Sequence, residues 1–272
     1  MTNYPEFSVL MAVYYKDNPE FLKEAVDSVL QQTLSPAEIV IIKDGRLTDE
    51  LEAVLSSYSA ESRIKVFGYE DNRGLGLALN YGVEKCSCGI IARMDADDIS
   101  REDRFEKEME ALIGQQYDFV GSNTQEFTGT PQQIQSTRIM PEHPAEILEY
   151  SKTRNPFIHP SVMTYKSIIL SCGNFQNVYL CEDYDMWVRI LEKGYKAYNI
   201  QDFLVYMRVG KDFYKRRGGW KYCKAIVGFK RRLYKKGYMS FMAYQKTKFS
   251  TIIVSLMPGF LREFVYKKFL RG

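Results

Sequence analysis

The sequence predicts an α/β fold with a doubly wound, mostly parallel sheet and a basic helical extension at its C-terminus. Apolar runs of strand length alternate with amphipathic helical patterns over the first 120 residues. Acidic residues directly follow two of the expected strands. The last quarter of the chain carries a large excess of Lys and Arg. Together these observations favour one catalytic or binding domain followed by a module with a different partner.

The elements of the first part follow one another as repeated strand and helix units. Strands are expected at residues 7–13, 38–42, 64–69, 90–94 and 119–121, and helices at 19–30, 48–58, 75–83 and 102–113. Repeats of this length predict parallel strands in a Rossmann-like arrangement. Ligands of such sheets bind at the carboxyl ends of the strands, so Asp44 and residues 95–98 are expected to meet there.

The alternation of strands and helices weakens in the middle of the chain. Residues 125–155 are polar and contain Gly129 and three prolines, and we expect a loop-rich excursion. The pattern then predicts a strand at 161–163, a helix at 182–193 and a strand at 197–205, with helices after Lys211.

Charge divides the chain into residues 1–207, the main domain, and residues 208–272, the extension. The extension contains 18 Lys and Arg residues against Asp212 and Glu263, whereas the whole chain carries only +3. Such a basic module indicates an anionic partner, either a membrane surface or nucleic acid. The N-terminus lacks the pattern of a secretory signal and the five cysteines are not spaced as pairs, so we expect a cytoplasmic protein with reduced thiols.

The run Asp95-Ala96-Asp97-Asp98 places three carboxylates directly after a buried strand. Because like charges at a strand end repel one another, a divalent cation is expected there, and hard oxygen ligands select Mg²⁺ or Mn²⁺. The alternative is an acidic turn in which one Asp caps the helix that begins near residues 100–103.

Four segments in this order resemble inverting glycosyltransferases of family 2, which have the GT-A fold. They are residues 8–14 (SVLMAVY), 43–45 (KDG), 93–98 (RMDADD) and 182–189 (EDYDMWVR). Residues 154–160 (RNPFIHP) and 214–220 (YKRRGGW) further resemble bacterial transferases that build capsule or O-antigen repeat units. The resemblance implies transfer of a hexose, glucose or galactose, from a UDP-sugar to a saccharide on polyprenyl diphosphate.

The same resemblance implies roles for residues on the donor side. Asp97 is expected to reach the Mn²⁺ or Mg²⁺ ion, and Asp95 to contact the ribose or the ion. Asp44 is expected to accept a hydrogen bond from the uracil ring, although an ordinary Asp-Gly turn is the alternative. Tyr14 and Arg73 are expected beside the nucleotide, with a core aromatic and a helix-capping loop as their alternatives.

Asp183 is the expected base that takes the proton from the acceptor hydroxyl. Its alternative role is that of any acidic residue at a helix N-terminus, where the helix dipole stabilises it. Contacts to the acceptor or to the diphosphate are expected from a further group of residues, which comprises His159, Glu182, Arg208, Arg216 and Arg217.

The end of the chain has the pattern of an amphipathic helix, with Phe260, Leu261 and Phe264 on one face and Lys267 and Lys268 around it. This pattern is typical of a helix on the inner leaflet of a membrane, and a helix docked on the protein is the alternative. Nucleic acid is a weaker expectation because no recognised module accompanies the charge.

Two other functions fit parts of the pattern. A sugar nucleotidyltransferase shares a similar sheet, but the loop after the first strand, residues 14–19, lacks the Gly-rich sequence with Arg and Lys typical of those enzymes. A non-catalytic, membrane-associated scaffold of the same fold is the other alternative, and the joint presence of Asp44, Asp97 and Asp183 argues against it.

Overall fold

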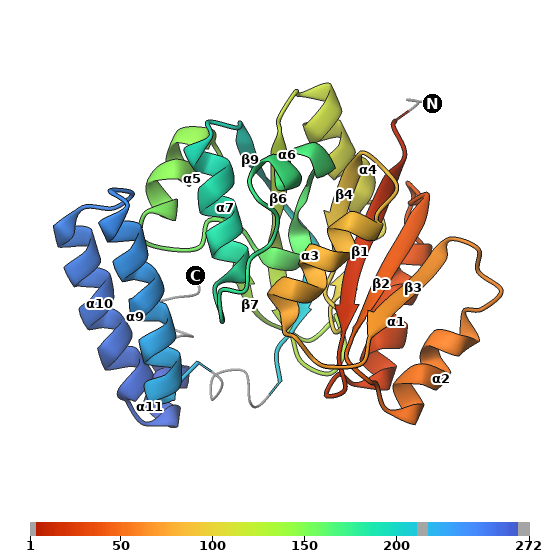
Figure 1. Ribbon diagram of the computed structural model, residues 1–272, viewed down its shortest axis with the longest axis horizontal. Coiled ribbons are helices and arrows are strands. Elements are labelled where there is room, and N and C mark those ends of the chain that lie inside the picture. The colour runs from red at the N-terminus through yellow and green to blue at the C-terminus, as the bar shows by residue number, and fades with distance from the viewer. Residues whose placement is uncertain (1–3, 211–216, 266–272) are drawn as a thin grey trace.

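The protein, seen in a computed structural model that describes residues 4–210 and 217–265, forms a central sheet covered by helices on both faces (Figure 1). The strands are β1 (Phe7–Val13), β2 (Glu38–Asp44), β3 (Ile64–Tyr69), β4 (Ile90–Arg93), β5 (Ile99–Ser100), β6 (Phe119–Phe127), β7 (Ile134–Arg138), β8 (Met163–Tyr165) and β9 (Ala197–Arg208). Their order across the sheet is β3-β2-β1-β4-β8-β6-β9-β5, and β7 pairs with β6.

The helices of the main domain are α1 (Pro19–Leu30), α2 (Asp49–Ser57), α3 (Leu75–Lys85), α4 (Arg104–Met109), α5 (Pro144–Ser151), α6 (Lys166–Ser171) and α7 (Glu182–Glu192). Those of the extension are α9 (Gly219–Lys235), α10 (Phe241–Leu256) and α11 (Gly259–Val265). Side-chain oxygens of Asn18 and Thr48 accept backbone N–H groups at the starts of α1 and α2, so the sequence sets both helix starts locally.

Alternation along β1 builds two cores on opposite faces of the sheet. Val9 and Met11 pack with α1, α2 and α4, whereas Leu10 packs with α3, α6 and α7. Successive side chains of a strand point to opposite faces, and both faces of this strand are apolar because helices cover both. The expected doubly wound arrangement of the first four major strands is therefore confirmed, with β1 parallel to both β2 and β4.

The second half departs from the simple repeat. β8 lies between β4 and β6 and is antiparallel to both, so the sheet is mixed. The prediction of a loop-rich segment at residues 125–155 is wrong, since this segment contains the end of β6, all of β7 and helix α5. The strand expected at 161–163 instead begins at Met163, after a 3₁₀ turn at His159–Ser161.

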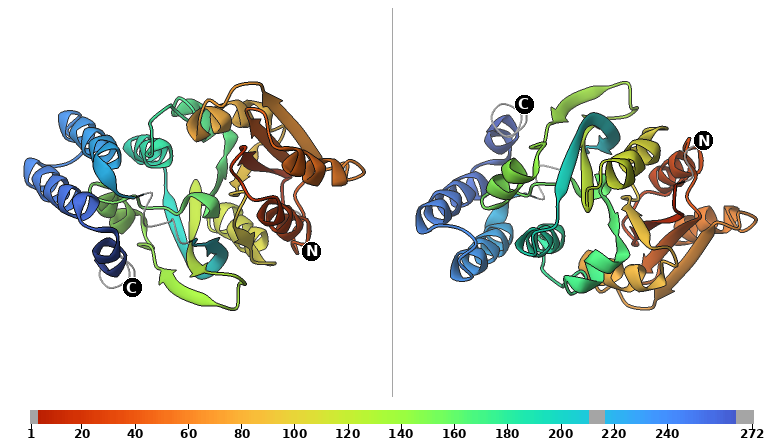
Figure 2. Two further views of the ribbon diagram at one scale, coloured as in Figure 1. Left: turned by 90° about the horizontal axis from the view of Figure 1, so that it is seen from below. Right: turned by 90° about the horizontal axis from the view of Figure 1, so that it is seen from above.

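The extension docks on the main domain through its first helix. Phe229 and Leu233 of α9 pack against Tyr184 and Val188 of α7 in a third apolar cluster. The buried Lys230 ammonium donates to the carbonyl oxygen of Thr153 at 2.8 Å and to the Tyr184 hydroxyl at 2.6 Å. Figure 2 shows α9 and α10 at the end of the molecule opposite α2. The extension is thus joined to the helix that begins with Glu182 and Asp183.

Candidate active site

The aspartates after β4 form one compact cluster. Asp95, Asp97 and Asp98 each offer a carboxylate oxygen, and these oxygens lie within 4.8 Å of one another. Asp98 is only 3% exposed, and burial together with the charges of Asp97 and Asp95 raises its pKa well above the ordinary value. Three carboxylates held this close fit a hard divalent cation, which would relieve their repulsion. The capping alternative fails, because the N-cap residue of α4 is Asp103 and not an aspartate of the run 95–98.

Arg93 and Arg208 hold this acidic segment from two sides. The buried Arg93 guanidinium pairs with the Asp95 carboxylate. The backbone N–H of Arg208 donates to Asp98 at 2.8 Å, and its Nε donates to the carbonyl oxygen of Asp97 at 3.0 Å. The Arg208 guanidinium also pairs with Glu24 and stacks on Phe21 and Phe127. These contacts position the aspartates, and the expected contact of Arg208 with a diphosphate stays a prediction.

Asp44 organises the loop that follows β3. Its carboxylate is 4% exposed and accepts from the Tyr69 hydroxyl, the Asn72 amide and the backbone N–H groups of Arg73 and Gly74, at 2.8 to 3.0 Å. Because a carboxylate accepts about four hydrogen bonds, this set satisfies Asp44. A contact with uracil stays a prediction, and it requires the base to displace or share one of these donors.

Tyr14 and Arg73 lie at the same edge of the sheet. Tyr14 follows β1, and its backbone N–H donates to Asp17 at 2.9 Å. The Arg73 guanidinium is exposed and lies 4.4 Å from the centre of the Tyr69 ring. The expected contacts of Tyr14 and Arg73 with the nucleotide stay predictions.

Gly45→Ala is expected to disrupt this loop. Gly45 has φ +88°, and a Cβ there would lie 2.7 Å from the backbone nitrogen of Asn72. We expect a loss of stability on the order of 2 kcal/mol from the disfavoured backbone and the clash, together with weaker UDP binding. Thermal unfolding and UDP calorimetry test this, with Gly89→Ala as the control because a Cβ at Gly89 meets nothing within 4 Å. Equal behaviour of the two variants would contradict it.

A second acidic group faces the aspartates from the start of α7. The Asn155 amide donates to Asp183 Oδ2 at 2.7 Å, which fixes that carboxylate. Burial and the neighbouring charge of Asp183 raise the pKa of Glu182 from 4.5 to about 7. Asp95 raises this pKa further and Arg93 lowers it, so Glu182 lies within electrostatic reach of both. The structure therefore brings together the two acidic segments that lie far apart in the sequence.

A glycine in α3 permits this approach. A Cβ on Gly76 would lie 2.5 Å from the carbonyl oxygen of Gln176 and 3.2 Å from Glu182 Cβ. Only a glycine therefore lets the first turn of α3 pack against the segment that leads into α7.

His159 is within electrostatic reach of both Asp183 and Asp95 but is not a cation at neutral pH. Its ring is partly enclosed by Phe175 and Trp187, and the buried Nε2 has no hydrogen-bond partner among residues 4–210 and 217–265. Burial, and then the Arg93 charge, lower the pKa of His159 to about 4, although Asp183 and Asp95 oppose the shift. A neutral imidazole with a free nitrogen suits an acceptor hydroxyl better than a phosphate.

Two predicted residues, Arg216 and Arg217, precede α9 in the sequence. Arg217 is half-buried in the turn before that helix, and Arg216 lies outside the described residues. Sequence reasoning missed Arg93 and Asn155 as members of the site. A charged residue that ends an otherwise apolar strand is the signal that marks Arg93, whereas Asn155 carries no such signal.

The family of the chain follows from comparison with known proteins. Residues 8–177 match the protein family "Glycosyl transferase family 2". The chain belongs to this family. Its matched part includes Asp44 and the three clustered aspartates, while Asp183 lies just beyond it.

Two relatives extend the likeness of this family 2 chain over nearly its whole length. It is 39% identical to a "UDP-Gal:alpha-D-GlcNAc-diphosphoundecaprenol beta-1,3-galactosyltransferase" of Escherichia coli, over 98% of this chain and 97% of the relative. It is 33% identical to the "Amylovoran biosynthesis glycosyltransferase AmsE" of Erwinia amylovora, over 98% of this chain and 100% of the relative.

Solved structures confirm the GT-A fold of this family 2 chain. The mannosyltransferase PcManGT from Pyrobaculum calidifontis, in complex with GDP-Man and Mn²⁺, matches with a TM-score of 0.63 and 16% identity, over 83% of this chain and 63% of that one. S. aureus TarS 1-349 in complex with UDP matches with a TM-score of 0.58 and 18% identity, over 82% of this chain and 64% of that one.

The raised pKa of Glu182 predicts how stability depends on pH. Between pH 4.5 and about 7 the folded state keeps a proton that the unfolded chain has released, so this residue lowers stability as the pH rises through that window. Glu182→Gln removes the dependence, which we expect to be on the order of 2 kcal/mol.

Thermal unfolding of both proteins in EDTA, from pH 4.5 to 8, tests this expectation. The wild-type Tm should fall relative to that of the variant as the pH rises. Glu108 also has a pKa raised to about 7, by burial, but it is present in both proteins and cancels in the difference. Parallel profiles would contradict the assignment of a protonated Glu182.

Proposed function

We propose that this protein transfers a hexose from a UDP-sugar, with inversion, to a saccharide carried on polyprenyl diphosphate. The observation that carries the proposal is the proximity of two acidic groups: the cluster of Asp95, Asp97 and Asp98, and the start of α7, where Glu182 is within electrostatic reach of Asp95 and Asn155 holds Asp183. The aspartate cluster suits the binding of a metal-bound diphosphate, and Asp183 suits the role of the base. The printed name of the E. coli relative supports a UDP-galactose donor and a GlcNAc diphosphate lipid acceptor.

The residues divide the reaction between them. Asp183 accepts the proton of the acceptor hydroxyl while that oxygen bonds to the anomeric carbon, and the bond from this carbon to the diphosphate breaks with its electrons leaving on UDP. Glu182, whose pKa is raised to about 7, is uncharged below that pH and can then donate a hydrogen bond to a sugar. Asp97 and Asp95 would hold Mn²⁺ or Mg²⁺, which compensates the charge of the leaving diphosphate when bound.

A UDP-release screen tests the donor and acceptor classes. The donors are UDP-galactose, UDP-glucose and their N-acetyl forms, each with and without Mn²⁺, and the acceptor is GlcNAc diphosphate on a short lipid. We expect turnover that depends on the metal and is fastest with UDP-galactose. The failure of UDP to bind in the presence of Mn²⁺ would instead favour the non-catalytic scaffold. Family membership argues against the sugar nucleotidyltransferase.

Contact with an anionic membrane surface is part of the proposal. Among residues 4–210 and 217–265, none of the helices is long and apolar enough to cross a bilayer. Large apolar side chains of the extension are nevertheless exposed, with Met242 at 81% and Phe260 at 73%, and Phe249 and Ile253 lie between them in sequence. The predicted terminal helix begins as α11, whereas its expected residues Lys267 and Lys268 and the side chain of Phe264 lie outside the described part.

Co-sedimentation with vesicles tests this contact. We expect binding to vesicles that contain phosphatidylglycerol, weaker binding to neutral phosphatidylcholine, and loss of binding in Met242→Ser/Phe249→Ser/Ile253→Ser. Equal recovery of wild type and variant from anionic vesicles would contradict it.

A further inference from the structure

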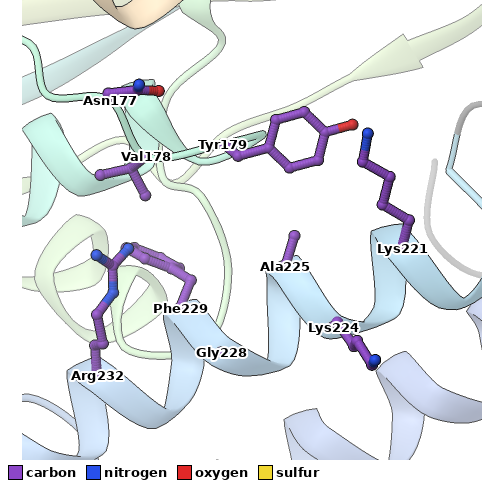
Figure 3. Close-up of a pocket in the computed structure, with 9 residues that line it drawn as sticks. All are labelled: Asn177, Val178, Tyr179, Lys221, Lys224, Ala225, Gly228, Phe229 and Arg232. Atoms are coloured by element: carbon purple, nitrogen blue, oxygen red, sulfur yellow. The ribbon is translucent and has the colours of Figure 1, made fainter.

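A groove of about 530 Å³ lies between the segment 177–179 and helix α9 (Figure 3). The α9 wall carries three cations, Lys221, Lys224 and Arg232, together with the ring of Phe229. The facing wall carries Tyr179, whose ring centre lies 5.0 Å from the Lys221 ammonium. The groove therefore combines positive charge with aromatic and apolar surface.

The cations of this groove contact aromatic rings, since Lys224 lies 5.5 Å from the centre of the Trp220 ring and Arg232 lies 5.5 Å from that of Phe229, but they have no carboxylate partner among residues 4–210 and 217–265. In the described part of the chain, the salt bridges leave out all three cations, and the groove has no Asp or Glu in its lining. Positions 221, 224 and 232 fall three and eight residues apart, so they share one stripe of the helix. A stripe of cations without carboxylate partners, beside an apolar wall, matches a ligand that is anionic at one end and apolar at the other.

The groove is also connected along the chain to the proposed base, Asp183. Its 177–179 wall leads through the exposed Leu180, which adopts φ +62°, into Cys181 and the start of α7. A bulky residue is strained in this conformation, so the surrounding structure must hold the backbone at Leu180 in place. Burial raises the pKa of the Cys181 thiol, and Lys230 and Arg232 oppose this shift, so Arg232 lies within electrostatic reach of the helix start.

We propose that this groove binds the diphosphate and first isoprenoid units of the polyprenyl-diphosphate-linked acceptor. Lys221, Lys224 and Arg232 would pair with the phosphate oxygens, and Tyr179 and Phe229 would pack on the isoprenoid chain. This inference rests on the proposed function and places the acceptor lipid on the α9 side of Asp183. The donor diphosphate keeps the opposite side, at Asp97.

Two acceptors of equal chain length separate recognition of the diphosphate from recognition of the sugar. One is GlcNAc α-diphosphate on an undecyl chain, and the other is undecyl α-GlcNAc without the diphosphate. For Lys221→Gln/Arg232→Gln we expect KM for the first acceptor to rise about tenfold or more, because charge-assisted hydrogen bonds contribute at least this much. KM for the second acceptor and for the UDP-sugar should match the wild type.

The matched control is Lys235→Gln/Lys236→Gln, which removes the same charge from exposed positions at the end of the same helix, outside the groove. Thermal unfolding checks that both variants are folded. A rise of KM in the control equal to that in the groove variant would overturn the proposal. So would an equal rise for the two acceptors, or an unchanged KM for the diphosphate acceptor.

A binding measurement keeps this inference apart from the proposed function. Farnesyl diphosphate is titrated by calorimetry in EDTA, with farnesol as the uncharged comparison. We expect binding of farnesyl diphosphate that the groove variant weakens and the control retains, and much weaker binding of farnesol. This result without any sugar transfer would retain the groove and reject the function, whereas transfer with groove-independent binding would retain the function and reject the groove.

Discussion

Asp183→Asn is expected to lower kcat by about 10²- to 10⁴-fold, the usual contribution of a positioned base. The change keeps the size of the side chain and leaves an oxygen that can accept from Asn155, which donates to Asp183 at 2.7 Å. It removes the ability to take the proton of the acceptor hydroxyl, together with one accepted hydrogen bond, because the other carboxylate oxygen accepts from the backbone N–H of Tyr184 at 2.6 Å. The fold should survive this loss, which thermal unfolding checks.

Steady-state kinetics and UDP calorimetry with Mn²⁺ separate the two roles considered for Asp183. The Kd for UDP should stay close to the wild-type value while turnover collapses. Asp185→Asn is the matched control, because Asp185 lies in the same helical turn but pairs with Arg189 instead of facing the aspartate cluster. If Asp183 only stabilised the helix dipole, both variants would lose a little stability and keep their turnover.

Asp97→Asn is expected to lower kcat/KM by about 10³-fold, since charge compensation of a leaving group contributes several kcal/mol. The Asp97 carboxylate belongs to the cluster whose oxygens lie within 4.8 Å of one another, and its loss leaves fewer hard ligands for the cation. Asp98 is buried and bound to the backbone of Arg208, so it is poorly placed to take over.

The test for Asp97 compares UDP binding with and without the metal. In Mn²⁺ the wild type should bind UDP more tightly than the variant, whereas in EDTA the two should bind alike. The EDTA arm is an internal control for damage to the nucleotide pocket. Equal tightening by Mn²⁺ in both proteins would reject Asp97 as a ligand.

The first half of the fold could be predicted because local signals decide it. Continuous apolar runs and capping residues such as Asn18 and Thr48 set the strands and helices, and β1 and β3 have the expected bounds. Of the later elements, α7 and β9 were also predicted, whereas β5, β7 and α5 were missed because they are short or polar. β7 reads Ile-Gln-Ser-Thr-Arg and is held by its pairing with β6, and β5 has two residues that pair with β9.

The sequence predicted the acidic residues of the site but not the residues that position them. The acidic residues could be found because carboxylates after strands and at a helix start are visible in the sequence. The contacts that position them join distant segments: Asn155 to Asp183 spans 28 residues, and Arg208 to Asp98 spans 110. No local pattern encodes such contacts, because the order of β4, β8, β6 and β9 in the sheet creates them.

The anomeric configuration of the product tests the central claim most directly. A UDP-hexose has an α linkage to the diphosphate, and attack from the opposite face, with Asp183 as the base, must invert it. We predict that proton NMR of the purified disaccharide product shows the large coupling between H1 and H2 of a β-linked galactose or glucose. An α-linked product would contradict the single-displacement mechanism and the role of Asp183.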